Sequence, residues 1–122
     1  MEESSTGRWY SSEYWSFTIG DEANDDYRIA VDGYSGDAGD GLRSTVWYPP
    51  LTFHDGMSFT TFDQDNDHNG SNCASLHSGG WWFNSCHLVC LTCISNHEWF
   101  SLSGVLHTFD QLSVSRMMIK LQ

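Results

Sequence analysis

The segment Asp63–His87 reads DQDNDHNGSNCASLHSGGWWFNSCH. It combines carboxylates, glycines, two cysteines and a pair of tryptophans, and its apolar residues follow neither the period of a helix nor that of a strand. Something other than regular secondary structure must therefore hold this segment in place. A bound cation and a disulfide bond are the two candidates that its composition offers.

The first half of the segment has the spacing of a calcium loop. Asp65, Asp67 and Asn69 occupy alternate positions, Gly70 is placed to permit a sharp turn, and Ser71 follows with a free carbonyl. In an EF-hand, oxygens at positions one, three, five and seven converge on the ion and position six is glycine. Position twelve is here a leucine instead of glutamate, and no helical pattern flanks the loop. We therefore predict a Ca²⁺ site that is not an EF-hand, with an acidic, solvated turn as the alternative.

Length and charge narrow the class of protein. The chain has 122 residues, enough for one domain with a single core. Its net charge is −11 with five Lys plus Arg, so nucleic acid is not an expected partner, because binding phosphates requires cations. No apolar stretch is long enough to span a bilayer, so no membrane association is expected.

The aromatic and alternating segments predict loop-rich β structure. Six Trp, seven Phe and five Tyr favour a core of large planar side chains. Alternation predicts a strand with one buried face in Trp9–Ile19, and further strands in Tyr27–Val31 and Met57–Phe62. Four glycines place Asp32–Leu42 in tight turns. The Pro49-Pro50 pair forbids regular structure around it.

Two aromatic pairs allow either a packing or a binding role. Trp47 and Tyr48 are expected in the core, with an exposed contact patch as the alternative. Trp81 and Trp82 are expected to wedge the loop against the sheet, with a stacking platform for a sugar ring as the alternative.

The four cysteines allow three pairings if all are oxidised. Cys90 and Cys93 form a CxxC motif that could be bridged, be free or be redox-active. Together with His87 and His97 they also have spacings compatible with a tetrahedral Zn²⁺ site. The sequence contains no GxSxG, HExxH or phosphate-loop motif, so an enzyme is not expected.

Five motifs in a fixed order resemble the second half of a fibrinogen C-terminal (fibrinogen-related) domain. They are YRIAVDGYSGDAGDGL from Tyr27, HDGMSFTTFDQDND from His54, and then NCA, GGWW and SCH. The resemblance implies an α+β fold with a central antiparallel sheet and a loop-rich, Ca²⁺-binding subdomain, truncated at the N-terminus. Residues 8–62 would belong to the central sheet, 63–110 to the loop-rich part and 111–122 to a returning strand.

The same resemblance implies where a ligand would bind. Cys73 would be bonded to Cys86, and the pocket beside this disulfide accepts acetyl groups of sugars in the ficolin-like and tachylectin-like branches. The peptide bond between Ser85 and Cys86 would be cis. By motif, the residues expected to form the pocket are His77, Phe83, Ser85, Cys86, His87 and Phe100.

The chain departs from that pattern in its pocket walls. His77 occupies a position that is often tyrosine, CLTCIS replaces the usual NLNGxY, and the later wall at 100–106 corresponds only loosely.

The resemblance as a whole leads us to expect a secreted, Ca²⁺-dependent module that recognises acetylated or microbial glycans in innate defence. The alternative is a module that binds an extracellular receptor or matrix protein. Homo-oligomers are common in the family, whose members are extracellular, although Met1–Gly7 does not read as a secretory leader.

Overall fold

A computed structural model describes residues 1–43, 52–95, 97–100 and 109–121. The predictions for Trp47, Tyr48 and the Pro49-Pro50 pair fall outside these residues, as does the later pocket wall at 101–106. Within the described ranges the chain forms six strands and two short helices. The strands are β1 (Glu2–Glu3), β2 (Ser12–Ile19), β3 (Ile29–Gly36), β4 (Val89–Cys90), β5 (Glu98–Phe100) and β6 (Phe109–Val114). The helices are α1 (Glu22–Asp25) and α2 (Cys73–His77).

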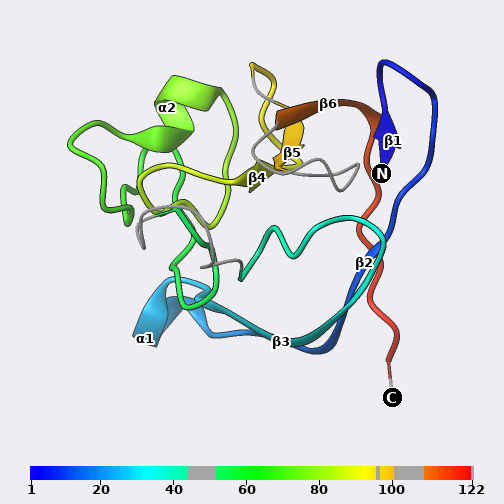
Figure 1. Ribbon diagram of the computed structural model, residues 1–122. Coiled ribbons are helices and arrows are strands. Elements are labelled where there is room, and N and C mark those ends of the chain that lie inside the picture. The colour runs from blue at the N-terminus through cyan, green and yellow to red at the C-terminus, as the bar shows by residue number, and fades with distance from the viewer. Residues whose placement is uncertain (44–51, 96, 101–108, 122) are drawn as a thin grey trace.

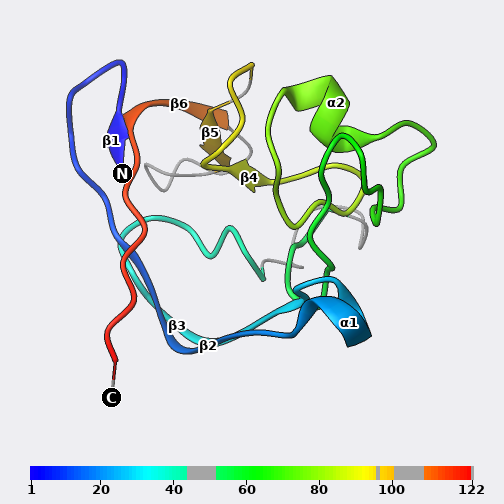
Figure 2. The ribbon, with the colours of Figure 1, turned by 180° about the vertical axis from the view of Figure 1, so that it is seen from behind.

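The strands form two antiparallel sheets. One has four strands in the order β1-β6-β5-β4, so the amino-terminal strand pairs with the carboxyl-terminal one. The other is the β2–β3 ribbon, which runs along the opposite side of the molecule in Figure 1. Figure 2 shows from behind that α2 and its loops lie beside β4, with α1 at the end of the ribbon. The predicted antiparallel fold with a loop-rich subdomain is confirmed.

The prediction of a strand before residue 20 is confirmed by β2, but its single buried face is wrong. Trp15 is 81% exposed and Ile19 is 45% exposed. Tyr14 and Phe17 are half-buried although they are three residues apart and therefore lie on opposite faces of the strand. Phe17 packs edge-on against Trp82, with ring centroids 6.4 Å apart. A two-stranded ribbon touches other parts of the chain on both faces, so alternation does not decide which side is buried.

The glycine-rich stretch that follows is a strand for half of its length. β3 continues through Asp32 to Gly36, so the prediction of tight turns is wrong for these residues. Gly33 has a φ of +68°, and a Cβ at this position would lie 2.9 Å from the Cβ of Trp15. Glycine therefore lets the ribbon pass beneath the tryptophan while the register of the ladder continues on both sides.

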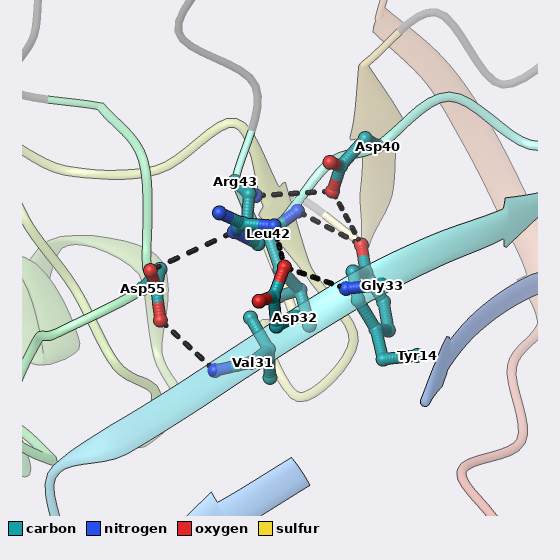
Figure 3. Close-up of polar contacts among 8 residues, drawn as sticks. All are labelled: Tyr14, Val31, Asp32, Gly33, Asp40, Leu42, Arg43 and Asp55. Carbon is teal, nitrogen blue, oxygen red and sulfur yellow. Dashed lines mark hydrogen bonds and ion pairs between the residues drawn. The ribbon is translucent and has the colours of Figure 1, made fainter. Parts of the chain in front are cut away.

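The turn after β3 is fixed by polar contacts to the ribbon (Figure 3). Arg43 forms an ion pair with Asp32, and its Nε lies 3.7 Å from a carboxylate oxygen of Asp55. The Tyr14 hydroxyl donates to Asp40 at 2.8 Å and accepts from the Leu42 amide at 3.3 Å. Burial raises the pKa of Tyr14, so this hydroxyl remains a donor at neutral pH. These contacts hold the turn at 40–43 against both strands of the ribbon and connect it to Asp55.

The core includes residues of both sheets and of the loops, and large aromatic side chains contribute to it, as predicted. Trp81, Phe83 and Trp99 are at most 3% exposed. Trp82 donates its indole N–H to the Tyr27 carbonyl at 2.8 Å, and Trp99 donates to the Gly39 carbonyl at 3.0 Å. The tryptophan pair therefore packs the loop against the ribbon. This confirms the predicted packing role of Trp81 and Trp82 and not the alternative, a stacking platform for a sugar ring.

The predicted strand at Met57–Phe62 is absent. Thr60 exchanges hydrogen bonds with Trp81 at 2.9 and 3.2 Å, and this is an isolated bridge. A turn in which Thr61 and Gln64 are bonded to each other ends the extended segment at once. Alternation alone could not foresee this, because a strand also requires a neighbour of matching length.

The carboxyl-terminal tail differs from the expected returning strand. β6 includes only residues 111–114 of the predicted strand at 111–122, and the described residues after Val114 form no strand. Met118 and Leu121 are 82% and 90% exposed. The described tail after β6 therefore exposes apolar side chains and is not part of a sheet.

His54 is completely buried and joins two loops. Its Nε2 accepts hydrogen bonds from the amides of Leu88 and Val89 at 3.2 and 3.3 Å, so its Nδ1 must carry the proton and donate to the Trp82 carbonyl at 2.7 Å. Burial lowers the pKa of His54 to about 4, because a second proton would face two N–H groups in a dry site.

This histidine makes folding sensitive to acid. Between pH 6.5 and about 4 the unfolded chain binds a proton at His54 that the folded chain does not, so the free energy of unfolding falls as pH falls. The loss attributable to this group is about 3 kcal/mol at the lower end. Urea unfolding at pH 7, 6 and 5 checks this against His54→Gln, which does not titrate. Equal pH slopes for the two proteins would contradict the assignment.

Candidate functional site

The predicted calcium loop is shaped by a repeated side-chain contact. Asp65 Oδ1 accepts from the amide of Asp67 at 3.2 Å, Asp67 Oδ1 from that of Asn69 at 2.8 Å, and Asn69 Oδ1 from that of Ser71 at 3.0 Å. Each acceptor bonds the amide two residues onward, which is the Asx-turn pattern. Successive turns of this kind coil the chain tightly through alternate acidic and amide side chains.

Gly70 does not make this bend, contrary to the sequence-based expectation. Its φ is not in the left-handed region, and a Cβ at this position would meet nothing within 4 Å. The side-chain contacts of Asp65, Asp67 and Asn69 supply the curvature instead. The similarity to an EF-hand therefore lies in the alternating oxygens and does not extend to the glycine.

The donor set suits a hard cation. Asp65 is exposed and Asp67 is half-buried. Burial raises the pKa of the Asp67 carboxyl above its usual range, and the charge of Asp65 adds to the rise. Two neighbouring carboxylates and an amide oxygen are ligands that Ca²⁺ prefers, and a dication would neutralise their repulsion. Within the described ranges no three His, Cys, Asp or Glu side chains cluster as metal ligands, so the predicted set depends on amide and backbone oxygens as well.

The predicted calcium loop is hydrogen-bonded directly to both ends of the disulfide segment. Asp67 Oδ2 accepts from the Cys73 amide at 2.8 Å. Asn69 Nδ2 donates to the Ser85 hydroxyl at 3.2 Å, and His68 Nδ1 lies 3.0 Å from Asn84 Oδ1. Order in the loop is therefore transmitted to the residues on both sides of the cysteine pair.

The disulfide implied by the resemblance is present. Cys73 and Cys86 are bonded, with their Cα atoms 5.7 Å apart, and the peptide bond between Ser85 and Cys86 is cis. The Asn84 amide donates to the Cys86 carbonyl at 2.7 Å, which closes a tight turn around that bond. Cys73 begins α2, so the bridge joins the helix to the segment that follows the tryptophan pair.

Three of the predicted ligand residues form a cluster of rings. The centroids of His77 and His87 are 4.5 Å apart, and Phe83 lies 6.0 Å from His77 and 5.9 Å from His87. Both ring nitrogens of His87 are buried and have no hydrogen-bond partner among the described residues. Burial lowers the pKa of His87 to about 3, and nearby His77 and His54 lower it further. His87 is therefore neutral and retains unused hydrogen-bonding capacity.

The remaining predicted ligand residues are placed less completely. Ser85 and Cys86 flank the cis bond beside this cluster. Phe100 ends β5, but its side chain lies outside what the structure describes. Two hollows in the described part of the chain are lined by residues other than the predicted ligand residues. One hollow of 550 Å³ lies between the turn at 61–63 and the end of α2, and the other, an open hollow of 260 Å³, is lined by Ile19, Tyr27, Phe59 and Trp82.

The zinc and free-thiol interpretations of the CxxC motif are wrong. Cys90 and Cys93 are bonded to each other, so neither sulfur is a thiolate ligand. His97 Nε2 lies 2.8 Å from the Ser115 hydroxyl instead. Spacing alone could not separate the two cases, because a ligand pair and a bridged pair need similar distances.

The bridged loop packs on the turn that follows α2. The Thr92 hydroxyl donates to the Gly80 carbonyl at 2.6 Å, and the Ser95 amide points to the His77 carbonyl at 3.5 Å. At Gly79 a Cβ would lie 2.3 Å from the Thr92 carbonyl oxygen. The bridged loop, which stands where the family usually has NLNGxY, therefore supports the backbone around His77.

Substitution at that close approach should be costly. Gly79→Ala is expected to destabilise the fold by about 2 kcal/mol, because backbone on both sides of the contact must separate. Gly70→Ala is the matched control, since its Cβ would enter open space. Thermal unfolding of the two variants measures the difference. Equal melting temperatures would show that the loop at 91–95 does not pack as described.

The comparison with known proteins identifies the family. The sequence matches the model of the fibrinogen beta and gamma chains, C-terminal globular domain, over residues 1–120. This chain belongs to that family. It is 46% identical to Gallus gallus tenascin over 76 residues, which cover 62% of this chain and 4% of tenascin. It is 40% identical to Homo sapiens fibrinogen C domain-containing protein 1 over 91 residues, which cover 71% of this chain and 18% of that protein.

Solved fibrinogen-like globes have the same fold. The fibrinogen-like globe domain of human ANGPTL2 is 38% identical with a TM-score of 0.62, covering 75% of this chain and 37% of that one. Lamprey fibrin D-dimer, complexed with the peptide Gly-His-Arg-Pro-amide, has a TM-score of 0.65 at 22% identity and covers 95% of this chain and 45% of that one. This chain thus spans less than half the length of each of these proteins.

The other members of the fibrinogen family share a general class of function. Fibrinogen-like domains are non-enzymatic binding modules for extracellular proteins or peptides, and homologues are generally extracellular. Among the described residues of this fibrinogen-family domain, no helix has the length and apolar character needed to cross a bilayer.

Proposed function

We propose that this fibrinogen-family domain is a secreted, non-enzymatic, Ca²⁺-dependent module that recognises acetylated or microbial glycans. The observation that carries the proposal is the pair of bonds from the calcium loop to the disulfide segment, Asp67 to Cys73 and Asn69 to Ser85. Ca²⁺ held by Asp65, Asp67, Asn69 and Ser71 would not touch the sugar. It would order the loop, and the loop would hold the ring cluster beside the cis bond.

The ring cluster supplies the chemistry that an acetyl group requires. Phe83, His77 and the ring face of His87 are apolar surfaces suited to a methyl group. A buried imidazole nitrogen of His87 without a partner is suited to bind an amide or carbonyl group of the ligand. The orphaned nitrogens support a ligand here, because buried polar groups are normally hydrogen-bonded.

Calorimetry tests the coupling between ion and sugar. N-acetylglucosamine is expected to bind with millimolar affinity in Ca²⁺ and to bind more weakly by about tenfold in EDTA. His87→Ala should abolish the heat in both buffers, whereas Trp15→Ala, an exposed aromatic on the ribbon, should not change it. Equal affinity with and without chelator would remove the coupling, and no heat at millimolar sugar would remove the glycan function.

A protein ligand is the second candidate. His77 replaces a residue that is often tyrosine in the lectin branches, and the bridged loop at 91–95 replaces the usual NLNGxY motif. The relatives include tenascin, which is not a lectin by name, and the lamprey structure holds a peptide. Capture of an extracellular protein that requires Ca²⁺ and is not displaced by N-acetylglucosamine would favour this candidate.

A further inference from the structure

The hollow of 550 Å³ beside α2 lies apart from the predicted ligand cluster. One wall is the turn Thr61–Asp63, and the other is formed by Ser75, Ser78 and Gly79 at the end of the helix. None of the residues that line it belongs to the ring cluster or to the predicted calcium ligands. Its volume falls within the range of small-molecule sites, about 300 to 1,000 Å³.

Both walls are fixed by a single side chain. Asn72 Nδ2 donates to the carbonyls of Thr61 and Phe62 at 2.9 and 3.4 Å, and its Oδ1 accepts from the Ser75 amide at 2.9 Å. Thr61 and Gln64 bond each other across the turn. The two sides of the hollow are therefore held at a fixed separation, so a ligand would not have to order them first.

The polar groups of the hollow are available to a ligand. Ser75 and Ser78 are exposed, and their hydroxyls make no hydrogen bond to other described residues. The Asp63 carboxylate is exposed and accepts from the Thr61 hydroxyl at 2.7 Å through one oxygen. These groups place hydroxyl donors and a carboxylate acceptor at opposite walls.

Phe62 adds an apolar surface at the edge of the same hollow. Its side chain is 78% exposed, so core packing does not account for it. An exposed ring next to hydroxyls and a carboxylate is suited to a molecule with one apolar face and a polar perimeter. A pyranose has this character, because its axial C–H bonds can lie on the ring while its hydroxyls bond the walls.

Charge selects among possible sugars. Asp63 is the one charged residue that lines the hollow in the described structure, and the whole chain carries a net charge of −11. Anionic sugars would be repelled. We propose that this hollow is a second binding site, separate from the His87 cluster, for a neutral pyranose that stacks on Phe62 and hydrogen-bonds Asp63, Ser75 and Ser78.

NMR with methyl β-D-glucopyranoside tests the site, because this sugar is neutral and has no acetyl group. Titration into the whole domain in Ca²⁺ should shift Phe62, Ser75 and Ser78 with millimolar affinity. Phe62→Ala should weaken binding by about fivefold or more, and Phe62→Trp should retain it. Because Phe62 is exposed, neither change should unfold the domain.

Two controls separate this site from the proposed acetyl site. His87→Ala should leave binding of methyl β-D-glucopyranoside unchanged, as should Trp15→Ala on the ribbon. The second-site proposal fails if no residue of the hollow shifts at tens of millimolar sugar, if Phe62→Ala binds equally well, or if the shifts centre on Phe83 and His87. None of these results depends on whether N-acetylglucosamine binds at His87.

Discussion

Asp67→Asn is expected to abolish the calcium response of this domain. Ca²⁺ should raise the melting temperature of the natural protein, because an ion that binds only the folded state stabilises it. Asp67 carries one of two carboxylates in the loop, and both of its oxygens bond backbone amides, those of Asn69 and Cys73. The variant loses a charged ligand and one of these acceptors, so in Ca²⁺ it should lose about 3 kcal/mol of stability.

The chelator comparison makes the effect of Asp67→Asn specific. In EDTA its loss should be smaller, because the change also removes the repulsion between Asp67 and Asp65. Asp63→Asn is the matched control: it removes the same charge two residues before the loop, and it should retain the calcium response. The melting temperatures of the three proteins, each measured with Ca²⁺ and with EDTA, decide the matter. A calcium response that survives Asp67→Asn would place the ion elsewhere or exclude it.

Removal of the Cys73–Cys86 bridge should have a comparably large effect. These cysteines lie 13 positions apart in the sequence, and opening a loop of this length increases the entropy of the unfolded chain by the equivalent of about 3 kcal/mol. Cys73 is also fully buried, and its amide is bonded to Asp67. The double variant Cys73→Ala, Cys86→Ala should therefore lose calcium affinity as well as stability.

The second bridge is the control for the first. Cys90 and Cys93 lie three positions apart in the sequence, so the double variant Cys90→Ala, Cys93→Ala should lose less stability, about 2 kcal/mol, and retain its calcium affinity. Urea unfolding under non-reducing conditions, with calcium binding measured by calorimetry, compares the two double variants. Equal calcium affinity in both would show that the disulfide and the ion loop are not coupled.

The local contacts of the central segment were largely predictable from its sequence. Alternating Asp65, Asp67 and Asn69 each bond an amide two residues later, which depends only on short side chains and nearby backbone. The motif likewise implied the bond between Cys73 and Cys86 and the cis peptide before Cys86. Gly70 was the exception, because side chains bend the loop and glycine does not.

Features that depend on distant neighbours could not be predicted in the same way. The exposure of Trp15, the extension of β3 through Gly36 and the single bridge at Thr60 each depend on which segment packs alongside. The zinc hypothesis failed for a similar reason, since sequence spacing cannot show whether Cys90 and Cys93 bond each other or an ion. The hollow between Phe62 and Ser78 could not be predicted from the sequence. Its two walls belong to different segments, and only the folded chain shows that the Asn72 side chain joins them.

The sequence by itself determined the family, the acidic loop and the cysteine pair that brackets it, because these depend on residue type and short spacing. Only the tertiary structure decided which faces are buried, how His54 joins Trp82 to Val89, and that the ion loop is bonded to Cys73 and Ser85. The physical reason is the distance along the chain over which each feature is determined. A side chain selects the amide two residues away by its own geometry, whereas burial and cross-chain bonds depend on the whole chain reaching one packed arrangement.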